Sequence, residues 1–138
     1  MRLDHVHMGC RDRDAMAAWF GSVLGLAPAE AFRVWEQSGG PLILRTSSGG
    51  NALALFEGEP PAADSDHTVA FAVDAQAFLA LWHLADALGL MHRSGASLRD
   101  FGPTDHDGLS WSLYFVSPEG HRIEVTSYDV AAVSEGLR

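Results

Sequence analysis

Two histidines and one glutamate in this sequence have the chemistry of a metal site. His5 lies near the N-terminus, His67 near the middle of the chain, and Glu124 in a run of β-branched residues near the C-terminus. Two imidazoles and one carboxylate suit a divalent transition metal, most typically non-haem Fe(II), and leave several coordination positions open. The three residues therefore predict a metal site, provided that the fold brings them together.

Glu124 follows a turn that should start a strand. In Ser117–Gly120, the proline presets φ at the second turn position, and the glycine supplies the backbone freedom that closes the turn. In the strand that follows, alternation places Glu124 on the opposite face from Ile123 and Val125. A carboxylate at that position faces either solvent or a polar cavity.

A repeat within the chain relates the two histidines. Three landmarks recur in the same order, at offsets of 62, 64 and 70 residues: Asp4–Asp12 with Asp66–Asp74, Leu24–Leu26 with Leu88–Leu90, and Gly50–Leu55 with Gly120–Val125. Such self-similarity indicates a duplicated supersecondary unit. His5 and His67 are then equivalent positions, whereas the counterpart of Glu124 is Ala54, which cannot bind a metal. The predicted site has three protein ligands, and His7, on the same strand face as His5, is an alternative to it.

Each half is predicted to have the order β-α-β-β-β. The expected elements, in chain order, are a strand over 3–12, a helix over 15–24, strands over 31–37, 41–46 and 51–57, a strand over 66–74, a helix over 75–88, and the strand that contains Glu124. The chain is therefore predicted to be a single α+β domain over 1–138, in which tandem βαβββ modules form a curled sheet around a cleft. The modules span about 1–58 and 66–128, with a linker at 59–65 and a C-terminal tail at 129–138.

Composition and charge narrow the class of function. The chain has 138 residues, 47% of them hydrophobic, and a formal net charge of −9. This sign argues against nucleic acid or an anionic membrane as a partner. No apolar run approaches the roughly 20 residues of a membrane helix, so the protein is expected to be cytoplasmic. We also expect a homodimer or a closed monomer, with the homodimer favoured, because one curled sheet alone would leave its inner apolar face exposed.

The single cysteine restricts how a metal can be held. Cys10 has no partner for an internal disulfide, and a thiolate-rich metal site cannot form, so Cys10 is expected to pack as a small apolar residue. Any metal must be held by histidine and carboxylate. Three further histidines, His83, His92 and His121, are expected to be polar surface residues without a functional role. Aromatic side chains at strand positions are usually part of the core, although a pocket for an aromatic ligand is the alternative for Trp35, Phe71 and Trp111.

Several stretches of the chain resemble the vicinal oxygen chelate superfamily, which includes glyoxalase I, fosfomycin-resistance transferases, bleomycin-resistance proteins and type I extradiol dioxygenases. The stretches are Asp4–Val6, Asp66–Val69 and Leu113–Glu124. The resemblance implies a fold of paired βαβββ modules, with His5, His67 and Glu124 as metal ligands. Glyoxalase I has a fourth ligand where this chain has Ala54, which argues against glyoxalase chemistry.

A second resemblance points to catechol-cleaving extradiol dioxygenases. Gly102–Gly108, with His106 inside it, and the strand from Tyr114 to Glu124 are similar to a loop and a strand of these enzymes. This implies that His106 lies beside bound dioxygen and that Tyr114 lies behind the metal ligands. Asn51 departs from the pattern, because those enzymes usually carry an acid/base histidine there.

The function expected from the sequence is ring cleavage of a small aromatic substrate of the catechol type. The metal expected from the resemblance is Fe(II), with Mn(II) or Zn(II) as alternatives. Two other functions remain open. One is an antibiotic-resistance protein that binds an aromatic drug without chemistry, and the other is a thiol transferase of the fosfomycin-resistance type that uses Mn(II) on the same three ligands.

Overall fold

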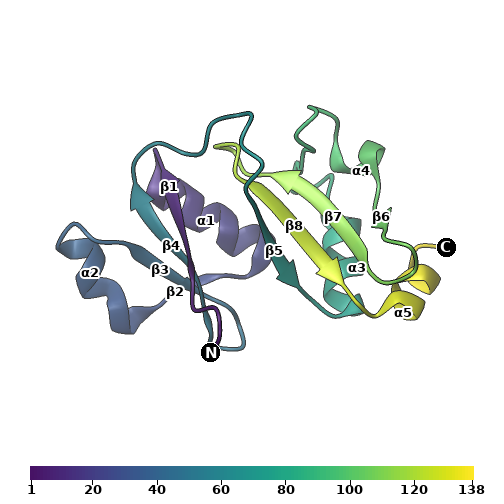
Figure 1. The fold of residues 1–138 in the computed structure, drawn as a ribbon, viewed down its shortest axis with the longest axis horizontal. Helices are drawn as coiled ribbons and strands as arrows, with labels where there is room; N and C mark the ends of the chain where they lie inside the picture. The colour runs from purple at the N-terminus through teal and green to yellow at the C-terminus, as the bar shows by residue number, and fades with distance from the viewer. The chain divides into compact units, whose positions relative to one another are not determined.

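The computed structural model describes all residues from Met1 to Arg138 and divides them into two compact units, Met1–Ala63 and Asp64–Arg138. The boundary falls inside the predicted linker at 59–65. Each unit contains one four-stranded sheet, and the strand orders are β1-β4-β3-β2 and β5-β8-β7-β6. The duplicated α+β architecture predicted from the repeat is thus confirmed (Figure 1). None of the helices has the length and apolar character needed to cross a membrane.

The sheet of the first unit combines a parallel and two antiparallel pairings. Its strands are β1 (Val6–Cys10), β2 (Ala27–Pro28), β3 (Leu42–Arg45) and β4 (Asn51–Glu57). The first strand pairs with β4 in parallel, and β3 pairs with both β4 and β2 in antiparallel fashion. One face of this sheet packs on α1 (Arg13–Leu24), which buries Met16 and Phe20.

Local sequence signals set both ends of α1. The Asp12 side chain accepts a hydrogen bond from the backbone N–H of Ala15 at 3.0 Å and so caps the first turn. Gly25 ends the helix in the left-handed conformation, with φ of 66°, which a residue without Cβ adopts at little cost.

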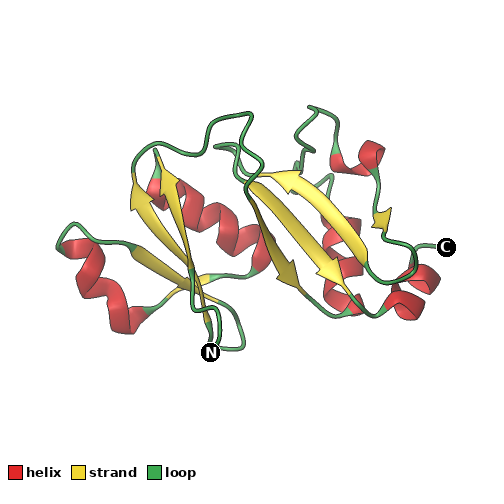
Figure 2. Ribbon diagram, in the orientation of Figure 1, coloured by secondary structure: helices red, strands yellow, loops and turns green.

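The strand predicted over 31–37 was wrong. This segment forms a short 3₁₀ turn, η1 (Glu30–Phe32), followed by the helix α2 (Arg33–Gln37), which is red in Figure 2. Good helix formers dominate the segment, and residues three apart interact across one turn. The rings of Phe32 and Trp35 stack with centroids 4.5 Å apart, and Arg33 pairs with Glu36 at 2.7 Å.

The η1 turn packs through Phe32 on the face of the first sheet that carries Ile43 and Ala54. Ala29, Ile43 and Ala54 are buried together there, and Phe32 and Phe56 pack against them. Ala54, the counterpart of Glu124 in the repeat, is therefore enclosed in an apolar cluster.

The sheet of the second unit has the same pairing pattern. Its strands are β5 (Thr68–Ala72), β6 (Thr104–Asp105), β7 (Trp111–Val116) and β8 (Arg122–Ser127). Strand β5 pairs with β8 in parallel, and β7 pairs with β8 and β6 in antiparallel fashion.

Three helices belong to the second unit: α3 (Ala75–Leu84), α4 (Leu98–Phe101) and α5 (Val130–Gly136). Figure 1 shows α3 and α5 on the same face of the sheet, where α3 contacts both α5 and β8. The predicted helix over 75–88 ends four residues early, and the tail at 129–138 contains a helix. Asp129 ties the two helices together, because its Oδ2 accepts a hydrogen bond from the backbone N–H of Ala75 at 3.0 Å.

The turn before β8 contains a buried histidine, which corrects the prediction that His121 is a surface residue. His121 is 2% exposed, and its Nδ1 lies 2.6 Å from Ser117 Oγ. The Ser117 hydroxyl also accepts hydrogen bonds from the backbone N–H groups of Glu119 and His121. The sequence Ser-Pro-Glu-Gly therefore forms a closed turn whose polar groups satisfy one another.

Candidate functional site

The open face of the second sheet carries the predicted carboxylate. Glu124 is flanked on β8 by Ile123 and Val125, which are buried on the face covered by α3. The strand register pairs Glu124 with Tyr114 on one side and with Ala70 on the other. These three side chains share a face because directly paired residues point the same way.

A chain of polar contacts crosses this face. The hydroxyl of the buried Ser112 donates a hydrogen bond to Glu124 Oε1 at 2.7 Å. Tyr114 Oη lies 3.0 Å from His106 Nε2, at the end of the loop that contains β6. Unit 2 therefore brings together three of the predicted site residues, His106, Tyr114 and Glu124, and adds Ser112, which the sequence analysis did not single out.

The environment of Tyr114 favours its protonated form. Burial raises the pKa of the phenol above its ordinary value, the hydroxyl of Ser112 acts in the opposite direction, and the negative charge of Glu124 raises the pKa further. At neutral pH the phenol is therefore a hydrogen-bond donor, with the ring of His106 as an acceptor within reach.

We expect the titration of Tyr114 to report this environment. The chain contains two tyrosines, so Tyr128→Phe leaves Tyr114 as the single ionising phenol in an ultraviolet titration. Its midpoint should lie above 10, the ordinary value for tyrosine. Adding Glu124→Gln removes the nearby charge and should move the midpoint downward. A midpoint at or below 10 in the single variant would show that the phenol is neither desolvated nor close to a negative charge.

Two other predicted residues, His5 and Asn51, are joined in unit 1 through Asp4. Asp4 Oδ2 lies 2.8 Å from His5 Nδ1 and accepts a hydrogen bond from Asn51 Nδ2 at 3.2 Å. The hydrogen bonds from His5 and then Asn51 hold the pKa of Asp4 below its ordinary value, so the side chain is a carboxylate at neutral pH. A carboxylate on Nδ1 fixes the ring orientation and leaves Nε2 as the free donor atom, which is the usual arrangement around a metal-binding histidine.

The strand register refines the equivalence between His5 and His67. In unit 1, His7 pairs with Ala54, and in unit 2, Ala70 pairs with Glu124, so the strands correspond at an offset of 63 residues (70 − 7), and the register counterpart of His5 is Thr68, one residue after His67. Both predicted ligands directly precede their strands, which begin at Val6 and Thr68. His67 therefore lies outside the paired ladder, is exposed, and makes no hydrogen bond through its ring. His7 instead packs on Phe56, with ring centroids 4.0 Å apart.

Each unit contains donor atoms of the kind that bind metal ions. His5 keeps Nε2 free, His67 has an uncommitted ring, and Glu124 is a carboxylate oriented by Ser112. Neither unit by itself gathers three histidine, cysteine, aspartate or glutamate side chains into a ligand group. The predicted set takes His5 from unit 1 and the other two residues from unit 2, so these ligands remain a prediction.

The aromatic residues considered for a ligand pocket belong mainly to other environments. Trp111 Nε1 donates a hydrogen bond to Ser134 Oγ of α5 at 3.0 Å, and Phe71 pairs in register with the buried Val125. Both side chains therefore lie on the helix-covered face, away from Glu124. Trp35 stacks on Phe32 in the first unit.

Comparison with known proteins identifies the family. The profile of the Glyoxalase/Bleomycin resistance protein/Dioxygenase superfamily matches residues 4–115. The chain belongs to this superfamily. The match includes His5, Asn51, His67, His106 and Tyr114 and ends before Glu124. No curated protein sequence matches the chain.

Solved structures of the superfamily share the fold. Oxidase ChaP-H1 is 23% identical, with 92% of this chain and 95% of that chain covered and a TM-score of 0.68. A glyoxalase/dioxygenase from Nostoc punctiforme is 21% identical over 92% and 90% of the two chains, with a TM-score of 0.68. The fosfomycin resistance protein FosX from Listeria monocytogenes, complexed with Mn(II) and sulfate, is 12% identical over 99% and 98%, with a TM-score of 0.64. At these identities the likeness concerns the fold.

Proposed function

We propose that this protein is a metal-dependent dioxygenase that cleaves the ring of a catechol-type substrate. The observation that carries the proposal is the contact between His106 and Tyr114 on the sheet face that also holds Glu124. A histidine and a protonated phenol within hydrogen-bond distance form a pair that can hold and transfer a proton. Their place beside a carboxylate suits a reaction in which a hydroxylated substrate loses protons.

The proposed metal ligands are His5, His67 and Glu124, and the expected metal is Fe(II), with Mn(II) or Zn(II) as alternatives. Superfamily members commonly bind divalent metals, and FosX is described with Mn(II). When bound, the ion would orient the two catechol oxygens and stabilise their negative charge.

The other side chains have supporting roles in this proposal. Ser112 orients Glu124, and Asp4 orients His5. Asn51 donates to Asp4 and cannot exchange protons, so proton transfer falls to His106 and Tyr114. General acid/base help of this kind typically contributes about 10²- to 10⁴-fold in rate.

Two fold relatives support the oxidative reaction class by name, Oxidase ChaP-H1 and the Nostoc glyoxalase/dioxygenase. The likeness to FosX supports a second candidate, a fosfomycin-type thiol transferase. Its metal would be held by the same donor set, so the two functions differ in the co-substrate, which is dioxygen in one and a thiol in the other.

The test is anaerobic reconstitution with Fe(II), followed by addition of a catechol and then of oxygen. We expect the catechol to perturb the spectrum of the metal, and oxygen to be consumed with formation of a ring-opened product. His106→Gln should slow product formation by about 10²-fold or more while metal binding is retained. His83→Gln, on α3, is the matched control and should leave both unchanged. If a catechol has no effect while a thiol adds to an epoxide with Mn(II) present, the transferase replaces the dioxygenase.

A further inference from the structure

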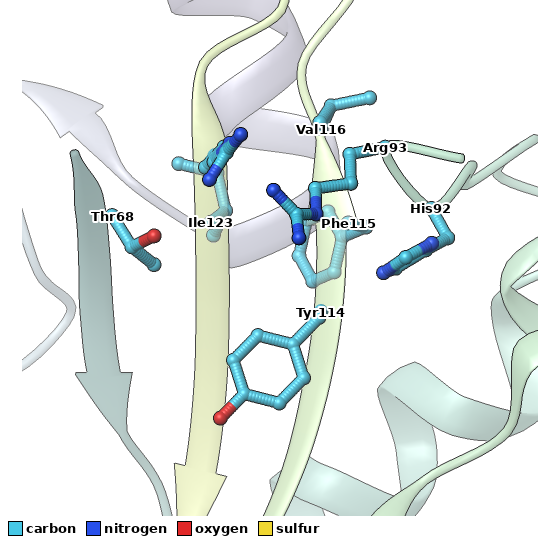
Figure 3. A pocket seen from close by; sticks show the side chains of 8 residues that line it. Thr68, His92, Arg93, Tyr114, Phe115, Val116 and Ile123 are labelled. Carbon is cyan, nitrogen blue, oxygen red and sulfur yellow. The ribbon is translucent and has the colours of Figure 1, made fainter. Parts of the chain in front are cut away.

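A cationic pocket lies on the open face of the second sheet, next to Glu124. Its volume is about 290 Å³, and it is lined by residues of β5, β7 and β8 and by the loop before α4 (Figure 3). The polar residues at its wall are Thr68, His92, Arg93, Tyr114 and Arg122. None of these carries a negative charge at neutral pH, so the pocket offers hydrogen-bond donors and positive charge to a ligand.

Arg122 forms the fixed part of the pocket. Its side chain is 17% exposed, and its Nη1 donates to Asp66 Oδ1 at 3.1 Å. The side chain of Asp66 is 94% exposed, so this ion pair is screened by solvent and contributes little. The remaining guanidinium donors of Arg122 are available to an anion that enters the pocket.

Arg93 adds a second guanidinium and has no partner of its own. In Figure 3 its side chain extends from the loop across β7 toward β8. It makes no ion pair, although unit 2 contains 11 Asp and Glu residues and only four arginines. Two of those four arginines line this one pocket. Although the unit as a whole is acidic, the two arginines make the pocket locally positive, and a positive pocket attracts an anionic group.

His92 is held in place as a neutral donor. Its Nδ1 accepts a hydrogen bond from the backbone N–H of Ser94 at 3.2 Å, which leaves the proton on Nε2. Its ring stacks on Phe101, with centroids 3.6 Å apart. Burial, and then the charge of Arg93, lower the pKa of His92, so the ring stays neutral at pH 7.

The pocket and the carboxylate are close neighbours on the sheet. Arg122 precedes Glu124 by two residues and points to the same face, which separates them by about 6.6 Å along the strand. Tyr114 lines the pocket and pairs directly with Glu124. The distance from Arg122 to Glu124 is therefore about that spanned by one aromatic ring with its substituents, so a single-ring ligand bound at Arg122 extends to Glu124.

We propose that this pocket binds a carboxylate of the substrate, so that the preferred substrate is an aromatic carboxylic acid with two adjacent hydroxyl groups. Arg93 and Arg122 pair with the carboxylate, and Thr68 and His92 donate hydrogen bonds to it. The diol then lies toward Glu124 and Tyr114. The carboxylate site stands on the pocket alone, whereas the diol and its cleavage rest on the proposed function.

The test separates binding from turnover. Calorimetric titration of the metal-free protein compares 3,4-dihydroxybenzoate with catechol, and we expect the carboxylate to bind about tenfold more tightly. Arg93→Gln and Arg122→Gln should each remove about tenfold of that affinity and leave catechol binding unchanged. Asp66→Asn frees Arg122 and should tighten binding of the carboxylate about two- to fivefold. Arg138→Gln, which removes an exposed arginine outside the pocket, should change neither ligand.

Several outcomes would overturn the inference. One is equal affinity of the unaltered protein for the two ligands. Another is an unchanged affinity for the carboxylate in Arg93→Gln, whose exposed and unpaired side chain is not needed for folding. A third comes from a competition titration, in which methylphosphonate and benzoate each displace 3,4-dihydroxybenzoate from the protein. Stronger displacement by methylphosphonate than by benzoate would assign the pocket to a phosphonate. A carboxylate preference without oxygen consumption after loading with Fe(II) would sink the dioxygenase proposal and leave the pocket assignment in place. Oxygen consumption with equal kcat/KM for catechol and 3,4-dihydroxybenzoate would rule out the pocket assignment and leave the dioxygenase proposal in place.

Discussion

Glu124→Gln is expected to weaken binding of Fe(II) or Mn(II) by more than about 100-fold and to abolish the proposed activity. Loss of a group behind a metal ligand typically costs 10- to 100-fold in affinity, and loss of the ligand's charge should cost more. Glutamine has the same shape and can still accept the hydrogen bond that Ser112 donates at 2.7 Å. The sheet should therefore remain intact, so that a loss of affinity reports the ligand and not the fold.

The measurement is a titration of metal-free protein with Mn(II), followed by electron paramagnetic resonance, together with a thermal melt of each variant. Glu135→Gln, an exposed residue of α5, removes the same charge far along the chain and should leave metal binding unchanged. Equal Mn(II) affinity in Glu124→Gln and the unaltered protein would mean that Glu124 is not a ligand. The open face of the sheet would then serve binding and proton transfer alone.

Phe115→Ala should lower the free energy of unfolding by about 3 to 5 kcal/mol, the usual cost of truncating a buried phenylalanine. Phe115 is 2% exposed and lies on the helix-covered face of β7, where it pairs in register with the buried Ile123. A domain of this size typically has a total stability of about 5 to 15 kcal/mol, so the variant should be close to unfolding at room temperature.

Urea denaturation of the variant and the unaltered protein measures this difference. Leu109→Ala is the control, because Leu109 is 75% exposed and its truncation should change stability by less than about 0.5 kcal/mol. A loss below about 1 kcal/mol for Phe115→Ala would show that its ring is not part of the buried core of the second unit.

The sequence by itself predicted the duplicated fold, because the signals that start and end elements are local. Asp12 and Asp74 cap α1 and α3 through hydrogen bonds to the backbone three residues on, and Gly25 ends α1 with positive φ. Such signals depend on a few neighbouring residues and can be read without knowing the rest of the chain. The face of Glu124 could also be predicted, because alternation along a strand has a fixed period.

Tertiary packing determined the secondary structure and the burial of residues where the local sequence pattern was ambiguous. The segment from Glu30 to Gln37 has residues compatible with strand or helix, and it is helical where Phe32 packs against the buried Ile43 and Ala54. His121 looks like a surface residue in sequence, yet the turn closes over it and pairs it with Ser117. Burial of a side chain depends on which other segments fold over it. The neighbouring residues in the sequence do not determine this.

The candidate site was likewise predicted in part from the sequence and in part only from the structure. Residue type and strand alternation singled out Glu124, the resemblance to extradiol dioxygenases singled out His106 and Tyr114, and the pairing of β7 with β8 placed Tyr114 and Glu124 side by side. The cationic pocket could not be predicted, because His92 and Arg93 come from a loop about 30 residues before Arg122 in the sequence. No periodicity relates a loop to a strand at that distance. Only the folded sheet, with its loop docked against β7, brings the two guanidinium groups to one cavity beside Glu124.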